Sequence, residues 1–215
     1  MRYRLSAYFM ALMVGTSAVA EKPGTIQREA RLHHARELLG KYYDKSVVAS
    51  GEGIRKINRR IYTWTREHLP AKFKKDYRKI AQAIIDTAVK HDFDPVFLLS
   101  VIEYESAFDP TRKGSLDEIG LMQLRPATAE WIAQKYGLKF VGRKTLRDPV
   151  ANIRIGTAYM DYLRENYDFQ ARLYISAYNM GERNVDSLVE KNVWPRAYAS
   201  HVMRYYVDFY AQIRG

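Results

Sequence analysis

The residue best suited to do chemistry is Glu105, which lies in the apolar segment 101–110. Asp94 and Pro95 precede it in the order of a helix N-cap and a first helical residue. In the helix that they predict, Glu105 continues an apolar stripe at helical spacing. The stripe consists of Leu98, Val101 and Ile102. A glutamate on such a face loses hydration, which raises its pKa and allows it to donate a proton near neutrality. Acid catalysis of glycosidic bond cleavage is one reaction of this kind.

A second glutamate, Glu103, lies only two residues before Glu105. A helix rotates the two side chains apart by roughly 160°. We therefore expect Glu103 to face solvent and Glu105 to face the core. The helix alone leaves one alternative open, in which Glu105 forms a buried ion pair with a lysine or arginine.

The elements that must position Glu105 are helices. Capped helical patterns follow one another from Lys74 onward and no convincing alternating strand pattern occurs, so the fold is predicted to be mostly α. Helices are predicted at about 26–43, 53–67, 80–88, 94–107, 126–136, 149–163 and 170–180, and from near Pro195 to the C-terminus.

The first 20 residues have the pattern of a signal peptide. Arg2 and Arg4 are followed by an apolar run, and Ala18-Val-Ala20 is a typical cleavage site. We expect export to the periplasm or the medium, with no stable membrane insertion once the signal is cleaved; an uncleaved anchor is the alternative. Residues 21–75 are expected to form a basic helical extension, and residues 76–215 the main domain.

Composition excludes several kinds of protein. The chain has no cysteine, which rules out disulfides, thiol catalysis and cysteine metal sites. Its five histidines lack the spacing of metal ligands, so no metal or cofactor is expected. The net charge of +11 favours an anionic partner, but the basic residues are scattered and no nucleic-acid motif is present, so we do not expect nucleic-acid binding. The sequence does not predict the oligomeric state.

Three ordered motifs resemble the soluble lytic transglycosylases, lysozyme-like enzymes that cut the glycan strands of peptidoglycan. The motifs are Glu105-Ser106 with Phe108 and Pro110, Gly120-Leu-Met-Gln123 with Pro126, Thr128 and Ala129, and Ala177-Tyr-Asn179 with Gly181. Between the last two, Asp148-Pro149, Asn152 and Gly156 are similar to a helix of the same family. The resemblance covers about residues 76–206 and implies a lysozyme-like helical domain with an N-terminal helical extension.

The resemblance also implies a reaction. Glu105 would protonate the glycosidic oxygen between N-acetylmuramic acid and N-acetylglucosamine, then remove the proton of the 6-hydroxyl, which leaves a 1,6-anhydromuramoyl end. One protein carboxylate suffices because the acetamido oxygen of the sugar can stabilise the cationic centre. The implied substrate-binding residues are Ser106, Ser115, Met122, Gln123, Tyr178, Asn179 and Tyr198, and the Tyr198 hydroxyl is expected to reach Glu105.

The chain departs from the family pattern in one loop. Gly114 stands where the family commonly has a serine, with Ser115 next to it, and Asp117-Glu118 replaces a small Gly-Ala pair. The two acids could form a solvated turn. Alternatively, Asp117 or Glu118 could be a second carboxylate that orients water, which would make the protein a hydrolytic muramidase similar to goose-type lysozymes. A peptidoglycan-binding module without catalysis is a further hypothesis.

Overall fold

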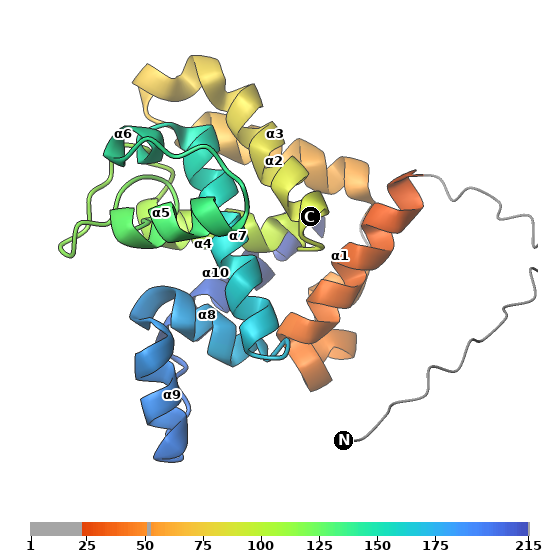
Figure 1. Ribbon diagram of the computed structural model, residues 1–215. Helices are drawn as coiled ribbons and strands as arrows, with labels where there is room; N and C mark the ends of the chain where they lie inside the picture. Colours follow the sequence, from red (N-terminus) through yellow and green to blue (C-terminus); the bar gives the residue numbers. More distant parts are fainter. Residues whose placement is uncertain (1–22, 51–52, 215) are drawn as a thin grey trace, which may run out of the picture.

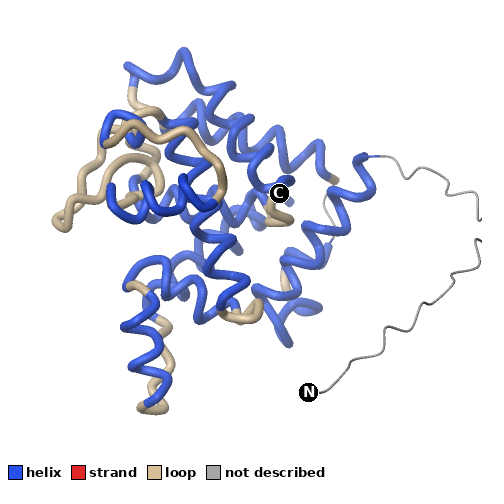
Figure 2. The backbone as a smooth tube through the Cα atoms, viewed as in Figure 1, coloured by secondary structure: helices blue, strands red, loops and turns tan. Residues whose placement is uncertain are grey.

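Helices are the regular elements of this chain in the computed structural model, which describes residues 23–50 and 53–214 (Figures 1 and 2). The expected signal peptide lies outside the described residues. The α-helices are α1 (Pro23–Leu39), α2 (Ile54–His68), α3 (Tyr77–Lys90), α4 (Pro95–Ser106), α5 (Pro126–Lys135), α6 (Arg143–Leu146), α7 (Pro149–Asn166), α8 (Ala171–Met180), α9 (Glu182–Glu190) and α10 (Ala197–Arg214). Three 3₁₀ helices are η1 (Gly40–Lys45), η2 (Val47–Ser50) and η3 (Ala71–Asp76). The prediction of a mostly α fold is confirmed.

Side-chain caps fix the starts of α4, which carries Glu105, and of α7. Asp94 accepts a hydrogen bond from the Val96 N–H at 2.9 Å, and Pro95 begins α4. Asp148 caps α7 in the same way, through the Ala151 N–H at 2.8 Å. Both starts agree with the sequence prediction, because capping depends on neighbouring residues alone.

The sequence prediction is wrong where one residue ends one helix and begins another. Gly181 ends α8 as expected, but with φ of 82° it also precedes α9, which the sequence did not predict. The helix predicted over 26–43 ends at Leu39 and continues as η1. Across the described ranges, the structure contains no helix with both the length and the apolarity needed to cross a membrane.

Helix α4 runs through the centre of the molecule and packs most extensively against α10 (Figure 1). The predicted apolar stripe is fully buried, since Leu98, Val101 and Ile102 are each 0% exposed. Helices α2 and α3 cover another side of α4, and α7 packs against α3, α5 and α8. The central position of α4 removes most of its surface from water.

The N-terminus of α4 is held by a buried polar cluster. The second carboxylate oxygen of Asp94 accepts hydrogen bonds from Tyr206 at 2.7 Å and Tyr210 at 2.6 Å, both on α10. Arg31 of α1 donates to the Tyr210 hydroxyl at 2.7 Å. Burial raises the pKa of Asp94, while the charge of Arg31 and the tyrosine hydroxyls oppose that rise. In addition to capping α4, the Asp94 side chain therefore binds α10 directly and is linked to α1 through Tyr210.

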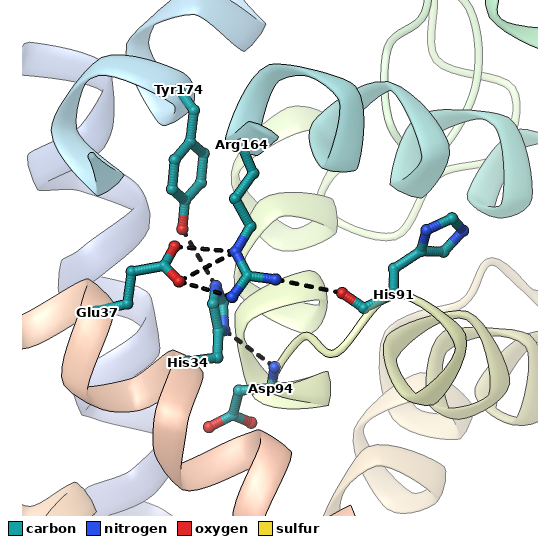
Figure 3. Close-up of polar contacts among 6 residues, drawn as sticks. All are labelled: His34, Glu37, His91, Asp94, Arg164 and Tyr174. Atoms are coloured by element: carbon teal, nitrogen blue, oxygen red, sulfur yellow. Dashed lines mark hydrogen bonds and ion pairs between the residues drawn. The ribbon is translucent and has the colours of Figure 1, made fainter. Parts of the chain in front are cut away.

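Helix α1 also supports the start of α4 through His34 (Figure 3). The backbone N–H of Asp94 donates to His34 Nδ1 at 3.0 Å, so the proton of the neutral ring lies on Nε2, which contacts the Tyr174 hydroxyl at 3.1 Å. Burial and the nearby charge of Arg164 lower the pKa of His34 well below its ordinary value. A neutral imidazole is the form that can accept this hydrogen bond.

Beside His34, Glu37 of α1 forms a buried ion pair with Arg164 of α7, at 2.6 Å between Oε2 and the guanidinium (Figure 3). Arg164 also donates to the His91 carbonyl at 3.3 Å, just before α4. The extension predicted at 21–75 thus contributes the charged side chains of Arg31 and Glu37 to the interior. Its neutral His34 binds the N-cap of the helix that carries Glu105. In each of these contacts of Arg31, His34 and Glu37, the two residues are more than 50 positions apart in the sequence.

Two N-cap aspartates in different surroundings allow a matched test. Asp94→Ala would leave two buried tyrosine hydroxyls and a buried guanidinium without their carboxylate, and we expect it to lower the free energy of unfolding by roughly 3–5 kcal/mol. Asp148→Ala removes an exposed cap and should cost only about 1 kcal/mol. Urea unfolding of both variants measures the difference. Equal costs would contradict a special role for the cluster around Asp94.

Candidate active site

Glu105 lines a cleft of about 370 Å³ near the C-terminal end of α4. The floor and walls come from the loop between α4 and α5, from Tyr159 of α7, and from Tyr178 and Asn179 at the end of α8. Figure 2 shows that the α4–α5 loop is one of the longest non-helical stretches of the described chain. The three sequence motifs, far apart in the chain, thus meet at one cleft.

The surroundings of Glu105 favour its protonated form. Burial raises the pKa of Glu105 to about 7, the Tyr198 hydroxyl opposes the rise, and the negative charge of Glu118 adds to it. Tyr198 of α10 donates to Glu105 Oε1 at 2.5 Å. Among the described residues Glu105 makes no ion pair with a lysine or arginine. A carboxyl group with these surroundings can both donate and accept a proton near neutral pH.

Glu103 differs from its prediction. The sequence places it towards solvent, but in the structure it is half-buried and accepts a hydrogen bond from the Trp64 indole at 3.0 Å. Helix α2 covers this side of α4, which the sequence of α4 alone could not reveal. The helix rotation still separates the two glutamates, since Glu105 lines the cleft and Glu103 does not.

Two of the predicted substrate-binding residues lie beneath the cleft instead of lining it. The Ser106 hydroxyl is buried and donates to the backbone carbonyls of Ile102, at 3.1 Å, and Leu121, at 2.9 Å. Met122 is fully buried, and its sulfur lies against Gly156 of α7. Ser106 therefore ties the catalytic helix to the α4–α5 loop, and Met122 packs that loop on α7.

Asn152 of α7 shapes the same loop, a function that sequence reasoning did not assign to it. Its side-chain oxygen accepts from the Met122 N–H at 2.8 Å, and its nitrogen donates to the carbonyls of Ile119 and Leu146 at 2.8 and 3.1 Å. Gly120 lies directly against this amide with φ of 83°, and a Cβ there would come within 2.5 Å of it. In the sequence, an asparagine on an otherwise apolar helix face could have indicated this function, because a buried polar side chain needs hydrogen-bond partners.

Gln123 and Tyr178 line the cleft as predicted candidates, each fixed by a backbone group. Gln123 donates from Nε2 to the carbonyls of Gly120 at 2.8 Å and Arg112 at 3.1 Å, which leaves its Oε1 as an acceptor. The Tyr178 hydroxyl donates to the Met122 carbonyl at 2.8 Å. Both side chains are thus held in one orientation before any ligand binds.

The remaining candidates are distributed around Glu105. Ser115 and Asn179 are exposed and line the cleft. Tyr198 is buried and reaches the cleft through its hydrogen bond to Glu105. Sequence reasoning did not identify Arg112, Arg125 or Tyr159, which also line the cleft. Arginines in a basic chain carry no signal of their own, and loop geometry decides which of them turn inward.

The two loop acids differ in position. Asp117 is exposed and forms a two-point ion pair with Arg143, whose hydrogen bonds lower the pKa of Asp117. Glu118 is half-buried, lines the cleft and pairs with Arg125 at 3.1 Å. Of the two acids that could supply a second carboxylate, only Glu118 faces the cleft.

Comparisons with known proteins agree with this geometry. The family model described as "Transglycosylase SLT domain" matches residues 82–199. A provisionally named soluble lytic murein transglycosylase of Haemophilus influenzae is 31% identical over 132 residues, which are 54% of this chain and 22% of that protein. Membrane-bound lytic murein transglycosylase C of Photorhabdus laumondii is 31% identical over 134 residues, 58% of this chain and 38% of that protein.

A solved structure has the same fold. An inactive variant of the lytic transglycosylase Slt from Pseudomonas aeruginosa superposes with a TM-score of 0.57 at 24% identity, over 62% of this chain and 24% of that one. The likeness confirms a lysozyme-like helical domain. The chain spans well under half the length of these relatives.

The raised pKa of Glu105 gives stability a defined pH dependence. Because the folded chain holds this proton more tightly than the unfolded chain, the contribution of Glu105 to stability is complete below its ordinary pKa and is lost as the pH rises towards 7. Glu105→Gln carries no such proton, so the variant should gain stability over the parent chain as the pH rises from about 5 to about 8. Urea unfolding at both pH values measures the gain. A gain that is the same at both would contradict the raised pKa.

Proposed function

Since the chain belongs to the transglycosylase SLT domain family, we propose that it is a peptidoglycan lytic transglycosylase with Glu105 as its acid and base. The observation that carries the proposal is the position of Glu105, a half-buried carboxyl in a cleft, held by a neutral tyrosine and with a pKa of about 7. The substrate would be the β-1,4 bond between N-acetylmuramic acid and N-acetylglucosamine.

The reaction needs one protein carboxyl in two protonation states. Protonated Glu105 donates its proton to the glycosidic oxygen as the bond to C1 of the muramic acid breaks, and the 2-acetamido oxygen stabilises the positive centre at C1. The Glu105 carboxylate then removes the proton of the 6-hydroxyl, whose oxygen bonds to C1. The proton returns to Glu105, no water is consumed, and a 1,6-anhydro ring forms.

A neutral hydrogen-bond donor suits a carboxyl that must change its charge. The Tyr198 hydroxyl fixes the position of Glu105 Oε1 and stabilises the carboxylate formed after the first proton transfer. An arginine in its place would stabilise the charged form far more and would reduce the ability of Glu105 to donate a proton. The ring of Tyr198 is buried, which limits its own movement.

We propose that Gln123, Tyr178, Asn179 and Ser115 hold the glycan. They line the same cleft as Glu105 and offer hydroxyl and amide groups that suit sugar hydroxyls and acetamido groups. Ser106 and Met122 are proposed to act on the substrate only through the loop that they support.

Hydrolysis of the glycosidic bond is a second candidate reaction, and one observation supports it. Glu118 lies in the cleft and could orient water as a second carboxylate, as in inverting glycosidases. The product would then have a reducing end instead of an anhydro ring. Asp117 is not a candidate for this role, because it pairs with Arg143 outside the cleft.

We further propose that the protein acts in the periplasm or outside the cell. Peptidoglycan lies there, and residues 1–20 have the pattern of a signal peptide. The positive charge of the chain suits the carboxylates and phosphates of the cell envelope.

The mass of the products tests the proposed function. Digestion of purified sacculi should release muropeptides with 1,6-anhydro ends, and mass spectrometry detects them because hydrolysis would add one water to each product. Glu105→Gln should release no products. Glu103→Gln is the matched control, since its amide can still accept from Trp64, and it should retain most activity. Products with reducing ends would sink the transglycosylase proposal in favour of the muramidase.

Asn179 allows a test of substrate binding that leaves the fold intact. Asn179→Ala removes an exposed side chain, so the free energy of unfolding should change by less than about 0.5 kcal/mol. Loss of a hydrogen bond to the glycan should raise KM roughly threefold to tenfold on a soluble muropeptide oligomer. Asn184→Ala, an exposed asparagine of α9 outside the cleft, is the control and should leave KM unchanged. An unchanged KM in Asn179→Ala would remove this residue from the binding site.

A further inference from the structure

Glu118 is fixed in the cleft by hydrogen bonds on both of its carboxylate oxygens. Oε2 accepts from the Leu116 N–H at 2.9 Å, and Oε1 accepts from Arg125 Nε at 3.1 Å. Partial burial favours the neutral acid, but these donors outweigh it and lower the pKa of Glu118. The cleft therefore contains a fixed negative charge in addition to Glu105.

The position of this charge depends on the missing side chain at Gly114. A Cβ built on Gly114 would lie 2.2 Å from Glu118 Oε2, 3.0 Å from its carboxyl carbon and 3.1 Å from Gln123 Oε1. Real Cβ atoms essentially never come as close as 2.2 Å to another heavy atom, so the end of the Glu118 side chain would have to shift. The Glu118 carboxylate thus occupies the space that any other residue at position 114 would need.

We propose that Glu118 is a second carboxylate of the active site, which favours the protonated form of Glu105 through its negative charge and which requires glycine at position 114. Two like charges in one partly dehydrated cleft disfavour each other, so the ionised carboxylate of Glu118 makes it harder for Glu105 to lose its proton. Glu118 is a positioning residue in this role, since it acts through Glu105. The proposal rests on the acid role of Glu105 in the proposed function.

Other groups around Glu105 come from several elements and set the background for this effect. Tyr198 donates to Glu105, which favours the ionised form, and burial favours the neutral form. The charged and titratable groups that face the cleft from the loop, α7, α8 and α10 are Arg112, Glu118, Arg125, Tyr159, Tyr178 and Tyr198. Of these, Glu118 is the one with a negative charge. Arg125 is neutralised in part by its pairing with Glu118.

The neighbouring Asp117 is a natural control. It has the same charge and lies one residue away, but it is exposed, pairs with Arg143 and does not line the cleft. An effect of general surface charge would be similar for both acids. An effect that requires a charge inside the cleft is expected for Glu118 alone.

The test is a titration of the Glu105 carboxyl by NMR of protein with ¹³C-labelled glutamate side chains, with Glu105→Gln to assign the signal. In Glu118→Gln the midpoint of Glu105 should move to lower pH, because a neutral amide of the same shape replaces the like charge. Arg125, released from its ion pair, would add to the shift in the same direction. In Asp117→Asn the midpoint should stay close to that of the parent chain.

The pH profile of muropeptide release provides the second readout. Activity that needs protonated Glu105 is lost as the pH rises through its pKa, so this loss should begin at lower pH in Glu118→Gln than in the parent chain. Gly114→Ala should shift the profile as well, since its Cβ would displace the carboxylate. In a Glu118→Gln background Gly114→Ala should add no further shift, which is the coupling that a double-mutant cycle detects.

An unshifted Glu105 midpoint in folded Glu118→Gln would overturn the proposal, as would an equal shift in Asp117→Asn. Additive shifts of Gly114→Ala and Glu118→Gln would overturn the requirement for glycine. The NMR titration needs no substrate, so it tests the charge effect even if the parent chain releases no muropeptides. A parent chain without activity would instead count against the proposed function.

Discussion

Helix α4 has a carboxylate at each end, and tyrosine hydroxyls of α10 bind both. Tyr206 and Tyr210 hold Asp94 at the N-terminus, and Tyr198 holds Glu105 near the C-terminus. At Glu105 the neutral hydroxyl fixes the carboxyl group without the full stabilisation of charge that an arginine would bring. Glu105 can therefore be half-buried, oriented and still protonated near neutral pH. The chemistry of the cleft depends on this packing of α10 against α4.

The loop between α4 and α5 carries most of the remaining cleft residues, and it needs support because it contains little regular structure. The support is polar and buried: the Ser106 hydroxyl binds the Leu121 carbonyl, and the Asn152 amide binds three backbone groups. Buried backbone groups that would otherwise lack partners are satisfied in this way. Gln123 and Glu118 are thereby presented to the cleft in fixed positions.

The sequence predicted a large part of the fold and a smaller part of the site. It correctly assigned the helix starts at Asp94 and Asp148, since a cap involves neighbours in the chain. It missed α9, because Gly181 was taken only as a helix end. It directed Glu103 to solvent, where Trp64 in fact covers it. The role of Asn152 and the difference between Asp117 and Glu118 were not visible at all, since loop side chains follow no period.

What the sequence by itself determined is the local geometry of α4: where the helix begins, and that Glu105 shares a face with apolar residues while Glu103 does not. Helical periodicity and capping decide these features within about four turns of chain. The tertiary structure decided what Glu105 meets, although the family resemblance had implied the contact with Tyr198. Tyr198 lies 93 residues away and Glu118 lies in an irregular loop, so both contacts depend on how distant elements pack. Such contacts depend on how the whole core packs, so no periodic pattern in the sequence predicts them.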